Sequence, residues 1–376
     1  MSRVLELTRE LTARPSVTPD DAGCQRLIAE RLIPLGFEAE WFLCGDVSNV
    51  LFTRGRGSPS FWFLGHTDVV PAGPENLWTF LPFHPDEKDG ELYGRGVADM
   101  KGAVAAMVVA LETYASQNPD HGGQIGLLLT SDEEGVAVDG IVKVAAELKR
   151  RGHRPDHCLV GEPSSQKTLG DTVRVGRRGS IYARLRVNGV QGHSAFPENL
   201  DNPVHRIAPF LDALVNEQWD SGDQEFPASH CQVSFVQAGT GAGNVTPAYL
   251  DLMANFRNGP ESPFESIRAR FEELLARHGI DDYEIGWEVM GEPFRSTPGK
   301  LRHAVVAAVE EVLGQTPEQN TGGGTSDGRY LAPLGCEVIE LGLVNATIHQ
   351  VDERTPVADL DRLFATYYDT IRRILA

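Results

Sequence analysis

Hydrophobic and polar positions along the first part of the chain form two alternating patterns. Segments 58–68, 123–134 and 155–163 each contain an apolar run, which is typical of buried strands. Between them, apolar residues spaced three and four apart predict helices at 101–116 and 140–152. Strands that alternate with helices predict an α/β fold, in which helices cover a sheet. Ligands of such folds bind at the carboxyl ends of the strands.

The pattern changes after residue 179. The sequence then predicts a strand, a helix, two strands and a helix, at 180–190, 201–215, 231–257 and 263–279. This order is enough for a small α+β sandwich. Helices at 300–314 and 359–375, with an apolar strand at 336–344, return to the first pattern. We therefore predict an α/β domain with a mixed sheet flanked by helices, formed by 1–179 and 293–376, and a second domain inserted at 180–292.

Length and charge narrow the class of protein. The 376 residues suit two globular domains. The net charge of −19 argues against nucleic acid as a partner, because phosphate binding needs clustered Lys and Arg. No apolar run reaches the roughly 18 to 20 residues that span a bilayer, so no membrane role is expected. The first 16 residues lack the apolar segment of a signal peptide, and we expect a cytoplasmic protein.

The cysteines point to no covalent or metal framework of their own. They are Cys24, Cys44, Cys158, Cys231 and Cys336. Their number is odd and no CxxC pair occurs, so that we predict neither disulfides nor a cysteine zinc site. Each is interpreted as a small core residue.

Metal-ligating residue types follow the predicted strands. His66 and Asp68 come at the end of one strand, where their spacing lets both face the same side. A carboxylate beside an imidazole fixes the tautomer that binds a metal, although a His-x-Asp pair by itself is a weak signal. Glu162 closes another strand just before a proline, and His349 follows the apolar strand at 336–344.

Three carboxylates stand at the end of the strand predicted at 123–134. Asp132, Glu133 and Glu134 repel one another, so that either a cation lies nearby or the segment is a solvated turn. Neighbours in sequence usually point apart, and one glutamate could bind metal while the other accepts a proton.

Asp99 offers a carboxylate between two strands. It follows two glycines at the start of a predicted helix, where it could simply cap the helix. As a ligand, its two oxygens could bridge two cations. Two His, two Glu and one Asp exceed the three or so protein ligands of one catalytic zinc ion, whereas two metals with a bridging carboxylate use all five.

Short motifs occur in the order typical of a known family. They are "GHTDVVP", "GRGVADMKG", "TSDEEG", "VGEP" and "NATIH". Over nearly the whole chain they resemble the co-catalytic di-zinc aminoacylase and carboxypeptidase family. Longer strings, "GRRGS", "QAGTGAGNVTP" and "TGGGTSDGR", resemble a member of that family that removes an acyl group ending in a carboxylate.

The resemblance implies a ligand set. His66 and Glu162 would hold one zinc ion, while Glu134 and His349 would hold the other. Asp99 would bridge them. Two Zn²⁺ per subunit are expected, and Co²⁺ or Mn²⁺ could replace zinc at one site.

The resemblance also implies catalytic roles. Asp68 would orient His66, and Glu133 would be the general base for hydrolysis by a metal-bridged hydroxide. The peptide bond after the bridging aspartate is often cis in this family, which makes the Asp99–Met100 bond a candidate. His193 would reach the active site of the second subunit of a homodimer, so that the inserted domain would act as a dimerisation or lid domain. Without the resemblance, His193 would be interpreted as a surface loop residue.

The substrate implied by the resemblance is a small molecule with several carboxylates. The residues expected to bind it are Arg177, Arg178, Asn244, Arg257, Gly324, Thr325 and Asn345. Guanidinium groups and backbone amides suit carboxylates, and the position of Arg177 in its motif favours it over Arg178. Two departures from the family pattern, Phe196 where Tyr is common and Asp352 where Asn is common, concern substrate binding.

Two other functions fit part of the sequence. Another deacylase of the family, such as acetylornithine deacetylase, would need the same metal ligands. A non-catalytic metal-binding homologue would have no use for Glu133, which argues against it.

Overall fold

The computed structural model describes residues 2–376, which form two compact units. Of the described residues, the first unit comprises 2–176, Ser296–Asn320 and Ser326–Ala376, and the second comprises Arg177–Arg295 and Thr321–Thr325. The sequence-based bounds of the inserted domain are 180 and 292. Two short strands, β9 (Gly176–Arg177) and β14 (Phe294–Arg295), lie where the chain leaves and re-enters the first unit.

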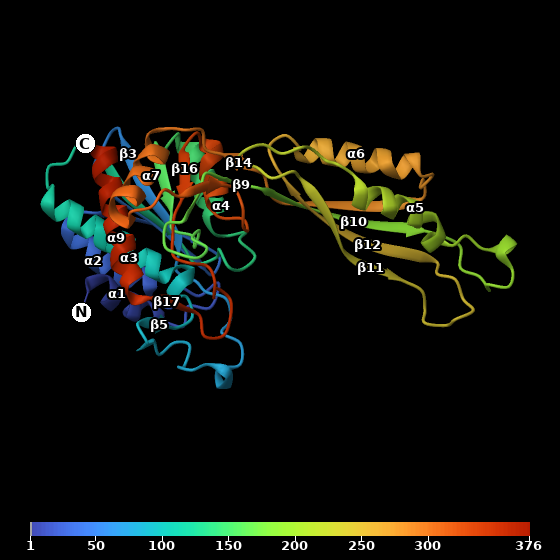
Figure 1. Ribbon diagram of the computed structural model, residues 1–376, viewed down its shortest axis with the longest axis horizontal. Coiled ribbons are helices and arrows are strands. Elements are labelled where there is room, and N and C mark those ends of the chain that lie inside the picture. The colour runs from blue at the N-terminus through green and yellow to red at the C-terminus, as the bar shows by residue number, and fades with distance from the viewer. Residues whose placement is uncertain (1) are drawn as a thin grey trace. The chain divides into compact units, whose positions relative to one another are not determined.

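An eight-stranded mixed sheet runs through the first unit in the order β1-β2-β6-β3-β7-β16-β8-β15 (Figure 1). Its strands are β1 (Glu38–Cys44), β2 (Val47–Arg56), β3 (Ser60–His66), β6 (Gly123–Thr130), β7 (His157–Val160), β8 (Thr172–Arg174), β15 (Glu318–Asn320) and β16 (Glu337–Glu340). The four neighbours β6, β3, β7 and β16 are parallel. Their carboxyl ends therefore meet at one edge of the sheet.

Both faces of this sheet are covered, as the predicted α/β fold requires. Every residue of β3 is buried. The ring of Phe63 packs 5.1 Å from that of Tyr367 on one face, whereas Trp62 packs 5.2 Å from His153 on the other. Alternate side chains of a strand point to opposite faces, so that a strand covered on both sides is apolar throughout.

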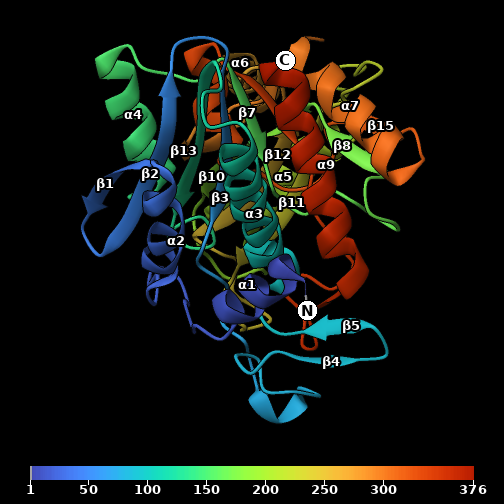
Figure 2. The same ribbon diagram turned by 90° about the vertical axis from the view of Figure 1, so that its left-hand side faces the viewer.

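The helices of the first unit supply these two layers (Figure 2). They are α1 (Arg3–Thr12), α2 (Cys24–Leu32), α3 (Gly102–Gln117), α4 (Ile141–Arg151), α7 (Lys300–Leu313), α8 (Gly328–Leu331) and α9 (Val357–Leu375). Helix α3 is buried on nearly every side and packs beside α9. A helix that is apolar all round belongs in the interior of an α/β layer, and α3 places its first residues at the sheet edge described above.

A small sheet lies beside the start of α3. It consists of β4 (Asp86–Lys88), β5 (Glu91–Tyr93) and β17 (Arg354–Pro356), in the order β17-β5-β4. A short π-helical turn, Val97–Lys101, joins this region to α3. Within it, the Asp99–Met100 peptide bond is cis, which confirms the prediction made for that bond.

The second unit is a four-stranded antiparallel sheet with two helices. The strands are β10 (Gly179–Asn188), β11 (His230–Ala238), β12 (Tyr249–Asn258) and β13 (Tyr283–Gly291), in the order β11-β12-β10-β13. Helices α5 (Pro203–Asn216) and α6 (Phe264–Arg277) pack on one face through a core that includes Phe210 and Phe271. The predicted order of elements lacked β13, although Tyr283, Ile285 and Trp287 alternate there with polar residues, which is the signal of a half-exposed strand.

The cysteines and the lengths of the helices bear on two of the predictions. All five cysteines are free, as predicted. Among residues 2–376, no helix combines the length and the apolar character needed to cross a membrane.

Candidate metal centre

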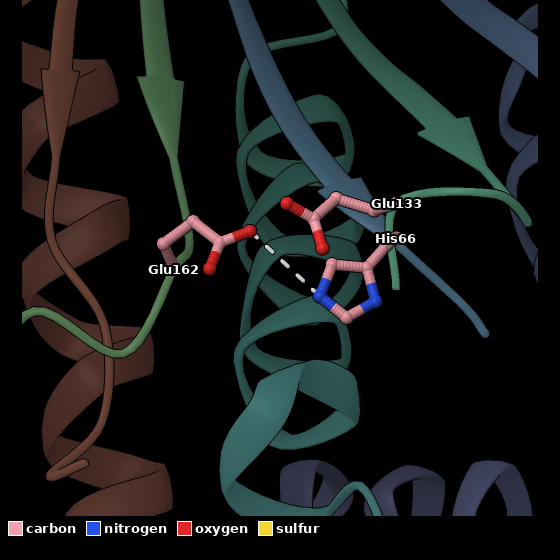
Figure 3. A group of neighbouring side chains, drawn as sticks. All are labelled: His66, Glu133 and Glu162. Atoms are coloured by element: carbon pink, nitrogen blue, oxygen red, sulfur yellow. Dashed lines mark ion pairs between the residues drawn. The ribbon is translucent and has the colours of Figure 1, made fainter. Parts of the chain in front are cut away.

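Parallel strands bring the predicted ligands to one edge of the sheet. His66 is the last residue of β3 and lies opposite Thr130 of β6, which Glu133 and Glu134 follow. Leu64 lies opposite Val160 of β7, and Glu162 follows that strand. Figure 3 shows the carboxylates of Glu133 and Glu162 directed toward the ring of His66.

His66 is held so that one ring nitrogen faces the carboxylates. The side chain is 1% exposed, and Nδ1 lies 2.9 Å from the main-chain oxygen of Asp68. A carbonyl oxygen only accepts hydrogen bonds, so Nδ1 carries the proton. Nε2 lies 3.2 Å from Oδ1 of Asp99 and 3.7 Å from Oε1 of Glu162. This is the tautomer that offers Nε2 to a cation.

Asp68 also organises the turn after β6. Its side chain is fully buried, with Oδ1 3.6 Å from Nδ1 of His66. Oδ2 accepts hydrogen bonds from the main-chain nitrogens of Glu133, at 3.2 Å, and Glu134, at 3.1 Å. Asp68 therefore fixes the ring of His66 through its main-chain oxygen and the backbone of the two glutamates through its carboxylate. The second contact was not indicated by the motif alone.

The three acidic residues after β6 have different roles: Asp132 stabilises the loop backbone, whereas Glu133 and Glu134 face the histidines. The carboxylate of Asp132 accepts hydrogen bonds from the main-chain nitrogens of Ala137 and Asp139, which closes the loop after the turn. Glu134 points elsewhere, with Oε1 3.0 Å from Nε2 of His349. The three adjacent acids thus have three different surroundings, so the segment is not a simple solvated turn.

The two oxygens of Asp99 face different imidazoles. Oδ1 lies 3.2 Å from Nε2 of His66, and Oδ2 lies 3.4 Å from Nε2 of His349. Glu162 lies on the His66 side, and Glu134 lies on the His349 side. This is the arrangement in which one carboxylate can bridge two cations, each with one further His and one further Glu.

Ligand atoms close enough to share an ion form two groups. One contains His66, Asp99 and Glu134, and the other contains His66, Glu133 and Glu162, with all atoms of a group within 4.8 Å of one another. Glu133, predicted as a base, thus lies as near to the His66 side as a ligand would.

The pKa values of the carboxylates indicate that the site favours bound positive charge. Burial raises the pKa of Glu133 well above its ordinary value, and burial together with the charge of Glu133 does the same for Glu162. Asp99 differs, because hydrogen bonds with His349 and His66 outweigh its burial and lower its pKa. Four carboxylates share the site with two imidazoles, an excess of buried negative charge that divalent cations would compensate.

Both imidazoles are basic for the same reason. Burial alone would lower the pKa of His66, but its hydrogen bond with Asp99 and the charge of Asp68 raise it well above the usual value. Hydrogen bonds with Asp99 and Glu134 raise the pKa of His349 to about 10. The neighbouring carboxylates therefore favour positive charge at both imidazoles.

Comparison with known proteins shows the family of the chain. The model of peptidase family M20/M25/M40 matches residues 62–373. The chain belongs to this family. The predicted resemblance is thereby confirmed at the level of the family.

Individual members of family M20 extend the comparison. Succinyl-diaminopimelate desuccinylase of Halorhodospira halophila is 52% identical over 376 residues, which cover 100% of this chain and 99% of that protein. Aminopeptidase PepT from Bacillus cereus has a TM-score of 0.82 at 20% identity, over 100% of this chain and 98% of that one. The YXEP protein of Bacillus subtilis, described as a dinuclear metal binding peptidase, has a TM-score of 0.71 at 15% identity, over 100% and 98%. At such low identity the two structures show only the fold.

The family and the full-length relative together identify the chain as a metal-dependent amidohydrolase. The remaining predicted site residues are distributed over both units. Asn345 follows the metal-centre strands, where its side chain donates to the main-chain oxygen of Pro163, next to Glu162.

The structure brings His193 and Asn244 together in the second unit. The side-chain nitrogen of Asn244 lies 3.4 Å from Nε2 of His193, and Nδ1 of His193 accepts a hydrogen bond from the main chain of Ala195. Both residues are exposed, and the ring of Phe196 lies 5.6 Å from that of His193. A paired, exposed loop of this kind can present an imidazole to a ligand.

The predicted arginines differ in their surroundings. Arg177 is buried and donates to the main-chain oxygens of Gly322 and Gly324, so that it holds the glycine-rich loop that also contains Thr325. Arg178 lies 3.4 Å from a ring nitrogen of His230, and burial together with the charge of Arg257 lowers its pKa. Burial and these same two arginines lower the pKa of His230.

His230 was not predicted as part of the site. It lies opposite Arg257 in the pairing of β11 with β12, and no motif marks it. Arg178, Arg257 and His230 form what we call the basic cluster. These three cationic or basic groups lie close together in a chain of net charge −19, and the charge of Arg257 lowers the pKa of both Arg178 and His230. Such an arrangement favours binding of an anion.

Proposed function

We propose that this protein hydrolyses N-succinyl-LL-2,6-diaminopimelate to succinate and LL-2,6-diaminopimelate, a step in the synthesis of lysine and peptidoglycan precursors. The observation that carries the proposal is the 52% identity, over all 376 residues, to a protein of that named activity. The cluster of two His and four carboxylates, of which His66, Asp99 and Glu162 are buried, supports amide hydrolysis by metal ions. We further propose that the enzyme works as a cytoplasmic homodimer.

The proposed cofactors are two Zn²⁺ per subunit, with Co²⁺ or Mn²⁺ as a replacement at one site. Imidazole nitrogen and carboxylate oxygen suit zinc and related first-row ions. His66 and Glu162 would hold one ion, Glu134 and His349 the other, and Asp99 both. When bound, such ions polarise an amide carbonyl and lower the pKa of water.

In the proposed mechanism, the side chains of this chain move one proton twice. Glu133 takes a proton from the attacking water and later returns it to the leaving amine, so that one carboxylate serves as base and then acid. Its raised pKa in the metal-free protein would fall beside cations, which keeps it ionised as a base. Asp68 keeps His66 and the backbone of Glu133 in place. His193 donates to the carbonyl oxygen as charge develops there.

Substrate recognition is proposed to use the residues around the glycine-rich loop. The substrate carries three carboxylates, which planar guanidinium groups bind well. The basic cluster supports Arg178 and Arg257 as direct contacts, whereas Arg177 supports the loop whose Gly324 and Thr325 offer a main-chain amide and a hydroxyl. Asn244 and Asn345 are proposed as further contacts.

A side-by-side assay tests the function. The zinc-loaded protein should hydrolyse N-succinyl-LL-2,6-diaminopimelate far faster than N-acetylornithine, because the basic cluster suits an acyl group that ends in a carboxylate. Faster turnover of the acetyl compound would favour the alternative of an acetylornithine deacetylase. No turnover of either compound with two ions bound would establish a non-catalytic metal-binding protein.

Replacing His349 with alanine should release one metal ion and retain the other. His66, Asp99 and Glu162 would still surround the first ion, whereas the second would keep only Glu134 and one oxygen of Asp99. Metal content measured after dialysis checks this. Full occupancy of both ions in His349→Ala would remove His349 from the ligand set.

Metal binding should release protons near neutral pH. The pKa of His349 is about 10, so this imidazole is protonated in the metal-free protein at pH 7, and the pKa of His66 is raised as well. Zinc needs neutral imidazole, so at least one proton should leave as the ions bind, and apparent affinity should increase with pH below the pKa of His349. Calorimetric titrations in buffers of different ionisation enthalpy give the proton count. His349→Ala should release one proton fewer, and a count of zero in the parent protein would contradict the assignment of the imidazoles.

A further inference from the structure

Glu353, a buried carboxylate outside the proposed ligand set, accepts several hydrogen bonds from the segment that carries Asp99. The side chain of Glu353 is 1% exposed. Its Oε1 accepts hydrogen bonds from the main-chain nitrogens of Ala98, at 2.9 Å, and Asp99, at 3.1 Å. Its Oε2 accepts from the main-chain nitrogen of Gly96, at 2.9 Å, and from Arg95, at 2.7 Å. Four donors on four nearly consecutive residues thus converge on a single side chain.

Glu353 also belongs to the segment that carries His349. Its main-chain oxygen accepts a hydrogen bond from the main-chain nitrogen of Gly94, directly beside the pairing of β17 with β5 (Figure 1). His349 lies four residues earlier, in a turn where His349 and Asp352 both have positive φ, 61° and 59°. Glu353 therefore connects two segments of the site. One carries Asp99, which contacts both imidazoles, and the other carries His349.

Residues 96–99 need the hydrogen bonds to Glu353 because little regular secondary structure holds their backbone. Asp99 and Met100 have non-helical backbone angles inside the turn at Val97–Lys101, and Gly96 has a φ of 86°. Without partners, the main-chain nitrogens of Ala98 and Asp99 would be buried donors with no acceptor. A carboxylate satisfies them better than a neutral group, since hydrogen bonds to an ionised acceptor are shorter and stronger.

We propose that Glu353 is a positioning residue of the metal centre, which fixes the backbone of residues 96–99 so that the two oxygens of Asp99 face the two metal positions. It touches neither metal nor substrate. Since Asp99 serves both positions, loss of Glu353 weakens binding of both ions. This inference rests on the proposed metal centre.

Zinc binding to the metal-free, full-length protein tests the role. In Glu353→Gln, one acceptor oxygen becomes an NH₂ group that faces donors, and the dissociation constants for both Zn²⁺ ions should rise by about 10- to 100-fold in calorimetric titration with Zn²⁺ alone. Glu337→Gln is the matched control. Glu337 accepts hydrogen bonds from the main-chain nitrogens of Leu301 and Arg302 in the same unit, away from the ligands. That variant should lose thermal stability but keep the zinc affinity of the parent.

Three outcomes would overturn the proposal. One is parental zinc affinity in Glu353→Gln, and another is an equal loss in Glu337→Gln, because either would make Glu353 a merely structural residue. If Glu353→Gln does not fold, Glu353→Asp replaces it, since it keeps the charge but is one methylene too short for all four donors. Failure of both to fold would assign Glu353 to folding as a whole. If the parent protein binds no zinc, the proposed metal centre is wrong, a result distinct from these three.

Discussion

Replacing Glu133 with alanine is expected to lower turnover by about 10²- to 10⁴-fold, the usual contribution of a general base, while both metal ions stay bound. The main-chain nitrogen of Glu133, and not its side chain, is what Asp68 holds, so the turn should survive the substitution. Of the proposed ligands, His66 would still contact both Asp99 and Glu162. Steady-state rates on the succinylated substrate, together with metal content, give both halves of the result.

The neighbouring glutamate provides the control for this experiment. Glu134→Ala should lose a metal ion, because Glu134 contacts His349 on the second side of Asp99. Metal loss in Glu133→Ala, with retention in Glu134→Ala, would show that the two glutamates have exchanged roles. This outcome has a geometric basis, since Glu133 lies in one of the two groups of potential ligands.

Loss of the His193 imidazole is expected to lower the rate by about 10²- to 10³-fold, as for removal of one donor to a developing oxyanion. His193 is exposed in the second unit, and its contacts there are with Asn244, Ala195 and Phe196. Strands β11 and β13 are the edges of that unit's sheet, and Phe235 and Val236 on β11 are exposed apolar residues. Open, apolar edges favour pairing with a second copy, and closed dimers are the commonest oligomers.

Subunit mixing tests whether His193 acts across that proposed dimer. His193→Ala and Glu133→Ala subunits, each nearly inactive, are mixed in equal amounts and allowed to exchange. If His193 serves the other subunit, each mixed dimer has one complete site of two, and random exchange restores about a quarter of parental activity. If exchange is demonstrated by a mass or fluorescence label but activity stays at the level of the single variants, His193 serves its own subunit or has no catalytic part.

The position of each ligand along the chain could be predicted from local pattern. Strands buried on both faces are continuous apolar runs, so their ends are visible in the sequence, and His66, Glu134 and Glu162 stand just at or after such ends. The resemblance of "GRGVADMKG" was needed for Asp99, because a carboxylate before a helix is more often a cap.

The convergence of those residues depended on the order of strands in the sheet. The order β6-β3-β7-β16 is set by packing between elements far apart in the chain, and hydrophobic periodicity does not encode it. Strand β13 was missed because its edge position leaves it half-exposed, so that its apolar signal is weak.

By itself, the sequence determined the alternation of strands and helices, the family, and the residue types offered at each strand end, because these depend on neighbours within a few positions. Only the tertiary structure decided that Asp68 holds both His66 and the acidic turn, that His230 joins Arg178 and Arg257, and that Glu353 grips the backbone of Asp99. Each of these depends on hydrogen bonds or charges between groups that lie from two to more than 250 residues apart. A buried polar group must find its partner wherever folding brings one, so the choice of partner has no local signature.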